Sequence, residues 1–300
     1  MLKKRIVLVL LVFVMCLVPC ASIAETNGGG TQQTSNDAKV SKIDLKKVKL
    51  IAHRGLLTEA PENTAKAFRL AGQKKFWGAE CDVWETMHDE KDRFDIVLNH
   101  DDTFDRMTNY SGKVGNYTAD EIKDIRITKG SNADIYNEGV CTLNEFLNIC
   151  RQYNMVPFVE IKGSAISDDG IKRIITTLKK KKLLKKAWIC SLEMDPLKRA
   201  AKYAKKKYKV KLKTEFMIFG SFSKKTVLSK IKRAHKNKIK GIWLNTKYVS
   251  KRTYKRVKKY KMKYMAGPFE ATDKSRSLLE YSVKKLKIKS AFLNGSPSDF

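Results

Sequence analysis

Short runs of β-branched and aromatic residues alternate with longer, lysine-rich segments of helical period from Ile43 to the C-terminus. In the longer segments apolar residues recur every three to four positions, as at Ile171, Ile174 and Leu178, so that one face of each helix can pack on a sheet. Strands that alternate with helices form parallel sheets. The pattern predicts eight strands, near residues 49–53, 78–85, 155–162, 187–192, 211–217, 240–245, 262–268 and 289–293.

Eight βα units are the number that closes a (β/α)8 TIM barrel, and a chain of 300 residues has room for a barrel of about 250. We therefore predict an α/β fold with one TIM-barrel domain over residues 43–300. One irregularity follows the second strand, where residues 94–100 resemble an extra strand that forms a hairpin with its end. A loop-rich stretch, 103–139, comes next. Together they predict a small hairpin and loop insertion after the second strand.

The first 24 residues have the layout of a secretory signal peptide. Basic residues at positions 3–5 precede the apolar stretch Ile6–Val18, and small residues then lead to the expected cleavage after Ala24. The apolar stretch is shorter than the ~20 residues that span a bilayer, and an uncleaved anchor is the alternative. Residues 25–42, rich in small and polar types, predict a flexible linker. We expect a secreted or cell-envelope-associated protein.

The chain is strongly basic, with 62 lysines and arginines against 31 aspartates and glutamates. Removing the leader would take away three cations and no acid, so the mature protein would stay cationic. Such a charge favours electrostatic association with an anionic cell envelope, a membrane surface or an acidic substrate. Solvated lysine-rich helix faces are the alternative explanation. No nucleic-acid-binding motif accompanies the basic stretches, so no specific nucleic-acid partner is expected.

Four cysteines follow the leader, and their wide spacing contains no CxxC pair and no zinc-ligand rhythm. An exported protein of this size does not depend on a disulfide framework. The sequence leaves open whether Cys141 and Cys150 form a disulfide.

Two predicted strands carry acidic residues in alternation with apolar ones. In GAECDVWET, Glu80 and Asp82 share one face of the strand, and in VPFVEIKG, Glu160 and Lys162 do the same. Carboxylates are too costly to bury beneath helices, so we place them at the barrel mouth, where their oxygens suit Mg2+ or Ca2+. A solvated edge strand or a salt-bridged pair is the alternative. The adjacent Lys162 would suit an anionic ligand.

Two of the four histidines lie where predicted strands end. His53 ends the first strand, at the edge where barrel enzymes assemble their sites, and His100 ends the extra strand. Imidazole titrates near pH 6.5, so two rings beside a bound group can act as acid and base. In APENTAKAF, Asn63 or Thr64 can cap the next helix. Glu62 is either a first-turn acid of that helix or a further group near the metal.

The order of these motifs resembles the glycerophosphodiester phosphodiesterase family. AHRG, PENT, ECD, VLNHD and VEIK follow one another from about residue 50, and RMTNYSGKVGNYTADEIKDI and CTLNEFLNIC are also similar to segments of that family. The resemblance implies a TIM barrel that hydrolyses glycerophosphodiesters with one divalent cation, Ca2+ or Mg2+.

The resemblance also implies roles for single residues. His53 and His100 match the family's acid/base histidines, Arg54 matches the residue that holds the phosphate, and Lys162 would assist Arg54 in holding it. The implied metal ligands are Glu80, Asp82 and Glu160, with Glu62 as a further candidate because its metal contact varies among members. The implied reaction passes through a cyclic phosphate, after which the histidines exchange roles. Which histidine begins as the base stays open.

Two segments depart from the family pattern. The family often ends a late strand with a tryptophan-containing WTVN, whereas this chain reads YMAGPFEAT, so Phe269 is the candidate for the aromatic wall beside the substrate. The short hairpin after the second strand is lengthened to TMHDEKDRFD. That change should alter the leaving-group preference more than the chemistry.

The sequence therefore predicts an exported, metal-dependent phosphodiesterase that releases glycerol 3-phosphate and an alcohol from small glycerophosphodiesters or from a glycerol-phosphate polymer. Two alternatives remain. One is a phospholipase D-like enzyme acting on lipids, and the other is a catalytically lapsed basic module that binds anionic envelope polymers. The leaving alcohol, the preferred cation and the oligomeric state stay open.

Overall fold

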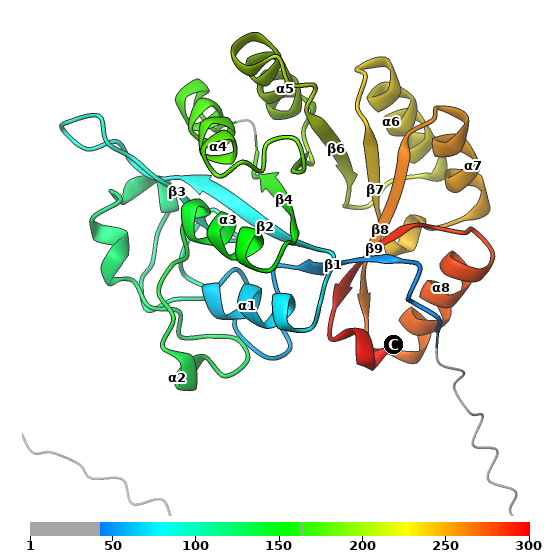
Figure 1. Cartoon of the computed structure of the whole chain (residues 1–300), viewed down its shortest axis with the longest axis horizontal. Helices are drawn as coiled ribbons and strands as arrows, with labels where there is room; N and C mark the ends of the chain where they lie inside the picture. Colours follow the sequence, from blue (N-terminus) through cyan, green and yellow to red (C-terminus); the bar gives the residue numbers. More distant parts are fainter. Residues whose placement is uncertain (1–42, 164) are drawn as a thin grey trace, which may run out of the picture. The chain divides into compact units, whose positions relative to one another are not determined.

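Eight parallel strands form a closed barrel in the computed structural model, which describes residues 43–163 and 165–300 (Figure 1). The barrel strands are β1 (Lys49–His53), β2 (Gly78–Glu85), β4 (Val156–Ile161), β5 (Trp188–Ser191), β6 (Lys213–Ile218), β7 (Gly241–Asn245), β8 (Lys263–Glu270) and β9 (Ser290–Asn294). They are hydrogen-bonded in the order β1-β9-β8-β7-β6-β5-β4-β2, and pairing of β1 with β2 closes the ring. The predicted TIM barrel and its eight strands are confirmed.

Seven helices connect the barrel strands and surround them (Figure 1). They are α1 (Ala65–Gln73), α3 (Leu143–Gln152), α4 (Asp168–Lys180), α5 (Met194–Tyr208), α6 (Lys224–Lys236), α7 (Lys251–Lys259) and α8 (Asp273–Lys284). Their apolar faces pack on the barrel as the helical period predicts. In α4, for example, Ile171, Ile174 and Leu178 are buried.

The insertion after β2 is confirmed. Strand β3 (Ile96–Leu98) pairs antiparallel with the end of β2, so the extra strand is real but shorter than predicted. The loop-rich stretch that follows contains only short helical turns: η1 (Val114–Asn116), η2 (Glu121–Asp124) and α2 (Ala133–Tyr136). It has a small apolar core of its own, formed by Val97, Phe104, Val114, Ile122 and Ile125.

Strand alternation divides the core into two parts. One set of side chains fills the barrel: Ile51, Phe158, Trp188, Cys190, Met217, Trp243, Met265 and Phe292. The larger set lies between the strands and the helices, as Val159 and Ile161 of β4 do. Each large apolar side chain buried in this way contributes about 1.5–3 kcal/mol to folding.

Phe269 corrects one expectation. Its ring is fully buried in the core between strands and helices, so it forms no aromatic wall beside a substrate. The pairing of β8 with β9 shifts between Ala266 and Phe269, and this irregularity places Phe269 opposite Leu293, which belongs to the same core. A shift in register changes which face of a strand a side chain occupies.

The disulfide that the sequence left open is not formed. Cys141 and Cys150 are buried free thiols, as are Cys81 and Cys190. The signal peptide predicted at 1–24 and the linker predicted at 25–42 lie outside the described residues. Within 43–163 and 165–300, no helix combines the length and apolar character needed to cross a bilayer.

A sharp turn after β1 positions His53 and Arg54, the first two candidate site residues along the chain. Arg54 and Gly55 both have positive φ angles, 58° and 84°, in the region that glycine adopts most easily. A Cβ atom on Gly55 would lie 2.6 Å from the Cβ of Ala67, so only glycine lets the turn pack this closely on α1. Hydrogen bonds from Leu56 N to Ala67 O and from Asn63 N to Arg54 O hold the turn.

Candidate active site

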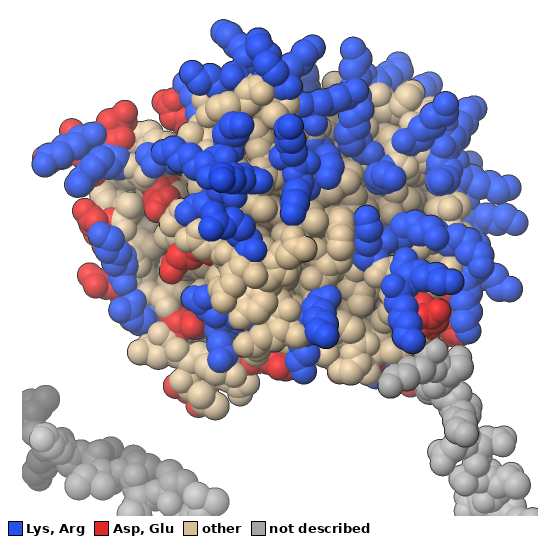
Figure 2. Space-filling view, in the orientation of Figure 1, with Lys and Arg blue, Asp and Glu red and all other residues tan. Residues whose placement is uncertain are grey.

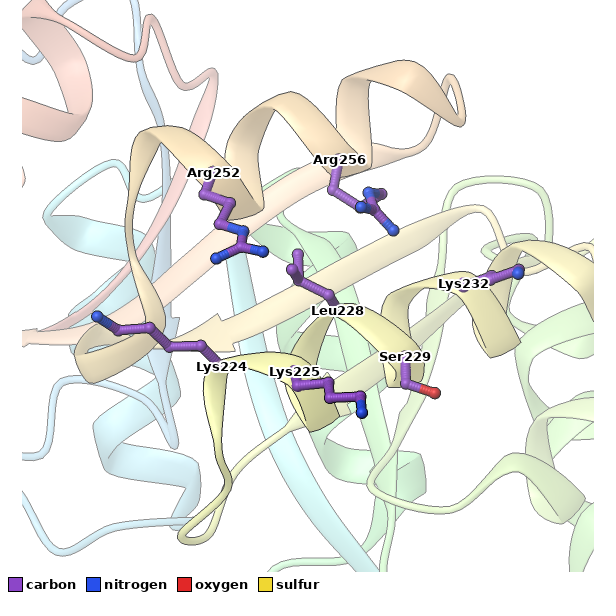
Figure 3. Close-up of a pocket in the computed structure, with 7 residues that line it drawn as sticks. All are labelled: Lys224, Lys225, Leu228, Ser229, Lys232, Arg252 and Arg256. Atoms are coloured by element: carbon purple, nitrogen blue, oxygen red, sulfur yellow. The ribbon is translucent and has the colours of Figure 1, made fainter.

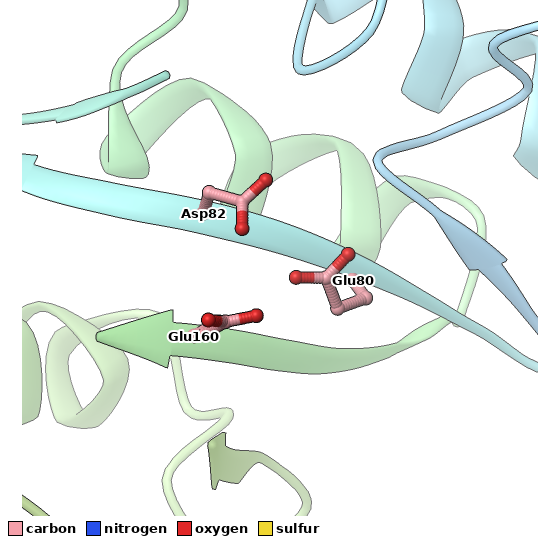
Figure 4. A group of neighbouring side chains, drawn as sticks. All are labelled: Glu80, Asp82 and Glu160. Atoms are coloured by element: carbon pink, nitrogen blue, oxygen red, sulfur yellow. The ribbon is translucent and has the colours of Figure 1, made fainter. Parts of the chain in front are cut away.

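The neighbouring strands β1, β2 and β4 bring His53 and the predicted carboxylates together. Register pairs His53 with Glu80, and Asp82 with Glu160. One ligand oxygen from each of Glu80, Asp82 and Glu160 lies within 4.8 Å of the others, and all three residues are buried. Figure 4 shows the three side chains converging from the two adjacent strands β2 and β4. This is the spacing that a hard divalent cation needs for oxygen ligands from two strands.

The three carboxylates strongly affect one another's ionisation. Burial, and then the charge of Asp82, raise the pKa of Glu80 well above its ordinary value and the pKa of Glu160 to about 7. Burial would also raise the pKa of Asp82, but the charges of Lys162 and Arg54 outweigh it and hold that pKa below its ordinary value. Glu80 Oε1 has no hydrogen-bond partner in the described part of the chain. A bound divalent cation would satisfy this oxygen and relieve the repulsion, so these residues fit a metal ion.

Asn63 fixes the position of Asp82. The Asn63 side chain donates a hydrogen bond to Asp82 Oδ2 (2.9 Å) and accepts one from the Asp82 backbone N–H (3.2 Å). Thr64 is the residue that caps α1, through a hydrogen bond from Ala67 N to its hydroxyl. The two residues that the sequence left as alternative caps therefore have different tasks.

The two predicted phosphate-binding cations lie against the carboxylates. Lys162 Nζ is 3.2 Å from both Asp82 Oδ1 and Glu160 Oε1. Arg54 Nε is 3.3 Å from Asp82 Oδ2, and the Arg54 backbone N–H donates to Glu80 Oε2 (3.1 Å). Burial would lower the pKa of Lys162, but the charges of Asp82 and Glu160 raise it overall, so its ammonium stays charged.

Glu62 binds two guanidinium groups. Its Oε2 accepts a hydrogen bond from Arg54 Nη1 (3.1 Å), and its Oε1 accepts one from Arg106 Nη2 (2.5 Å). It is not among the three clustered carboxylates, and its contact with a metal stays a prediction. Arg106 belongs to the insertion after β2, so this insertion helps to build the site.

Asn294, at the end of β9, orients His53. The Asn294 amide nitrogen donates to Glu270 Oε1 (2.6 Å), so its oxygen faces His53 Nδ1, 2.7 Å away. Because this oxygen can only accept, Nδ1 carries the proton and Nε2, 3.9 Å from Glu80 Oε2, carries the lone pair. Burial, and then the charge of Arg54, lower the pKa of His53 to about 4. His53 is therefore a neutral imidazole whose Nε2 can accept a proton at neutral pH.

His100 is fixed in a similar way. Its Nδ1 lies 2.7 Å from Asp101 Oδ1, and Arg106 Nε binds the second oxygen of Asp101. Burial lowers the pKa of His100, and the charge of Asp82 opposes that shift. The charges of Asp82 and Arg54 thus act on both histidines. The eight predicted site residues therefore lie in one connected group.

Sequence reasoning missed Asn294, Arg106 and Glu215. Asn294 gave one signal, a polar residue at the C-terminal end of a barrel strand. The only sequence signal for Arg106 was its position five residues after Asp101. Glu215 gave another signal, because it is the only acidic residue between Asp195 and Glu270.

Glu215, on β6, is a fully buried acid in the barrel interior. Cys190 Sγ donates to its Oε2 at 3.3 Å, and its Oε1 has no hydrogen-bond partner among the described residues. Burial raises the pKa of Glu215 to about 8. Its carboxyl group is therefore mostly protonated at neutral pH.

Fold and site together define a TIM-barrel protein with two histidines, two cations and three clustered carboxylates at the C-terminal ends of its strands. Residues 53–284 match the glycerophosphoryl diester phosphodiesterase family. The chain belongs to this family, and the resemblance read from its motifs is confirmed.

Similar proteins agree with this membership. The chain is 31% identical over 150 residues to glycerophosphodiester phosphodiesterase 1 of Mus musculus, a match that covers 48% of this chain and 43% of the relative. It therefore spans less than half of that relative's length.

Two solved structures of similar proteins share the fold. A glycerophosphodiester phosphodiesterase from Agrobacterium tumefaciens has a TM-score of 0.66 at 19% identity, over 84% of this chain and 98% of that chain. A phosphodiesterase from Oleispira antarctica, solved in complex with the product sn-glycerol-3-phosphate, has a TM-score of 0.66 at 21% identity, over 84% and 94%.

The role of Asn294 can be tested by removing its side-chain amide. Asn294→Ala should lower kcat/KM by about 10-fold or more, because His53 loses the acceptor that fixes its ring and its tautomer. The ring 15N chemical shifts of His53 should report a mixture of tautomers in place of the Nδ1–H form. Unchanged shifts would contradict this role. Ser298→Ala, a change at a serine just beyond β9, is the control and should leave the His53 shifts as they are.

The buried carboxyl group of Glu215 should make the free energy of unfolding depend on pH. Its carboxyl group keeps its proton in the folded state up to about pH 8 but loses it near pH 4.5 in the unfolded state. The folded state therefore binds more protons in this window, and stability falls as pH rises through it. Relative to Glu215→Gln, the wild type should lose about 1.4 kcal/mol of unfolding free energy per pH unit. Denaturant unfolding between pH 5 and pH 8 in metal-free buffer measures this slope.

The matched control is Glu193→Gln, which neutralises an exposed glutamate just after β5. It should show the same pH dependence as the wild type. If Glu215→Gln also follows the wild type, Glu215 is not a buried, protonated acid.

Proposed function

We propose that this chain is a metal-dependent phosphodiesterase that hydrolyses glycerophosphodiesters to glycerol 3-phosphate and an alcohol. One observation carries the proposal: two oriented imidazoles, two half-buried cations and three clustered carboxylates form one connected group at the barrel mouth. Family membership supports the same reaction class. The product bound in the Oleispira antarctica structure supports a glycerol phosphate as the product.

Glu80, Asp82 and Glu160 would hold the cation, Ca2+ or Mg2+, since both prefer oxygen ligands. When bound, such a cation stabilises the negative charge that develops on the phosphate oxygens. The guanidinium of Arg54 and the ammonium of Lys162 would bind the same oxygens from the protein side. Both groups lie within 3.3 Å of Asp82, so a phosphate bound at the cluster would be within their reach.

We propose that His53 begins as the base. Its Nε2 has a lone pair, and it would take the proton of the glycerol hydroxyl next to the phosphate as that oxygen attacks phosphorus. His100, whose Nδ1 faces the Asp101 carboxylate, would protonate the leaving alkoxide, because a carboxylate stabilises imidazolium better than an amide oxygen does. The phosphorus–alkoxide bond breaks and a cyclic phosphate remains. Water then opens the ring with the two histidines in exchanged roles.

Two alternative functions differ from this proposal in the substrate that is cleaved, or in whether any substrate is cleaved. A phospholipase D-like enzyme would cleave lipids, and Phe219 and Phe222, both exposed in the loop after β6, would favour contact with a lipid surface. A lapsed module would bind anionic envelope polymers without cleaving them. The complete set of predicted site residues argues against such a loss of activity.

We further propose that the protein is exported and associates with the anionic cell envelope. The leader-like residues 1–24 and the excess of 62 basic over 31 acidic residues support this location. The N-terminal sequence of the protein recovered from the cell exterior should begin at Glu25. Recovery of the full-length chain from the cell interior alone would contradict export.

The reaction can be tested with a panel of glycerophosphodiesters, sphingomyelin and lysolipid vesicles. Turnover should be confined to the glycerophosphodiesters, stop with EDTA and return with Ca2+ or Mg2+. His53→Ala and His100→Ala should each lower kcat by about 10²–10⁴-fold, the usual contribution of a general acid or base. His235→Ala is the control, because His235 is exposed and stacks on Tyr260 away from the site. Full turnover under chelation, or no turnover with any diester, would exclude the proposed mechanism.

A further inference from the structure

A basic cleft of about 520 Å³ lies between α6 and α7, outside the barrel. Figure 3 shows Arg252 and Arg256 extending from α7 toward α6, with Leu228 between the two helices. The cleft is lined by Lys224, Lys225, Leu228, Ser229, Lys232, Arg252 and Arg256. Five of these seven residues are cations, and none is acidic.

The stretch of chain that contributes the basic cleft contains almost no acidic residue. Glu215 is the only acidic residue between Asp195 and Glu270, and it is buried inside the barrel. Figure 2 shows the same separation, with lysine and arginine covering the side of α5, α6 and α7, and most visible acids on the side of the β2–β3 hairpin. Like charges held this close repel one another, so a bound polyanion would lower the free energy of the folded protein.

The spacing of the cations fits more than one phosphate. Lys224 and Lys232 are eight residues apart on α6, about 12 Å along the helix axis. Arg252 and Arg256, one turn apart on α7, form the opposite wall over about 6 Å. A single phosphate is too small to contact cations spread over this length, whereas a chain of phosphodiesters can follow it.

The lining residues also distinguish between kinds of polyanion. None is aromatic, so the cleft offers no ring on which a nucleic-acid base could stack. Its one large apolar residue, Leu228, is buried, so the cleft lining itself has nothing to insert into a bilayer; the exposed Phe219 and Phe222 precede α6 and do not line the cleft. A concave, purely cationic groove fits a flexible phosphodiester chain without bases.

We propose that the basic cleft binds a linear glycerol-phosphate polymer through several of its phosphates, which deepens the proposed function by naming the substrate class and rests on it. The strand order places β6 and β7 across the barrel from β1 and β2, which carry the candidate active site. Lys224, Lys225 and Arg252 belong to the first turns of α6 and α7, at the edge of the barrel where the active site also opens. The cleft retains the polymer while its end reaches the barrel mouth.

Binding can be measured apart from turnover. In EDTA, a fluorescently labelled glycerol-phosphate polymer should bind the wild type, and its affinity should fall at least 10-fold when four cleft cations are replaced by alanine: Lys224, Lys225, Arg252 and Arg256. The matched control replaces four exposed lysines of the same two helices that do not line the cleft: Lys236, Lys251, Lys255 and Lys259. The control carries the same loss of net charge and should lose less than 3-fold. Circular dichroism checks that both variants are folded.

Kinetics give a second readout. With metal present, the cleft variant should show a raised KM for the polymer at unchanged kcat, and both constants should be unchanged for a small glycerophosphodiester. Equal losses of affinity in the two variants, or no loss in the cleft variant, would overturn the proposal. The polymer would then be held by non-specific attraction to the basic surface as a whole. Stronger competition by phosphatidylglycerol vesicles or by an oligonucleotide with the same number of phosphates would overturn the choice of polymer. Cleft-dependent binding by a protein that cleaves no diester would refute the proposed function and leave the cleft assignment intact.

Discussion

The repulsion between three buried carboxylates is the constraint on which the site depends. Glu80, Asp82 and Glu160 share one small volume because neighbouring strands place them in register. Buried like charges are costly, so each must lose its charge by taking up a proton or be balanced by a cation. Asp82 stays ionised because Lys162 and Arg54 lie beside it, whereas the pKa of Glu80 and of Glu160 is raised. The resulting group is poised for a divalent cation.

Contacts between distant parts of the chain orient the groups around this cluster. A continuous series of polar contacts runs from Arg54 through Glu62, Arg106 and Asp101 to His100, and it links the turn after β1 to the insertion after β2. His53 is oriented by Asn294, at the end of β9, the strand that pairs with β1 on the side away from β2. The two rings therefore keep fixed orientations because elements remote in sequence pack together at the strand ends.

The distribution of charge divides the molecule in two. On the face seen in Figure 2, most acidic side chains lie on the side of the β2–β3 hairpin, while the side of α5, α6 and α7 is covered with lysine and arginine. A positive outer wall attracts polyanions and raises their concentration near the mouth, and this attraction weakens as salt screens it. The positive charge visible on this face is thus concentrated on the side of α5, α6 and α7.

The sequence by itself determined the barrel, its eight strands, the extra strand after β2 and the edge at which the histidines and carboxylates meet. These features follow from periodicity and from strand ends, which are local properties of the chain. Only the tertiary structure decided which groups contact each other. Asn294 lies 241 residues from His53, which it orients. Phe269 lies on the opposite face of β8 from the one expected, because of a shift in register that no local pattern signals. Hydrogen-bond partners and pKa values depend on closure of the barrel, since closure decides what is buried and what lies beside it.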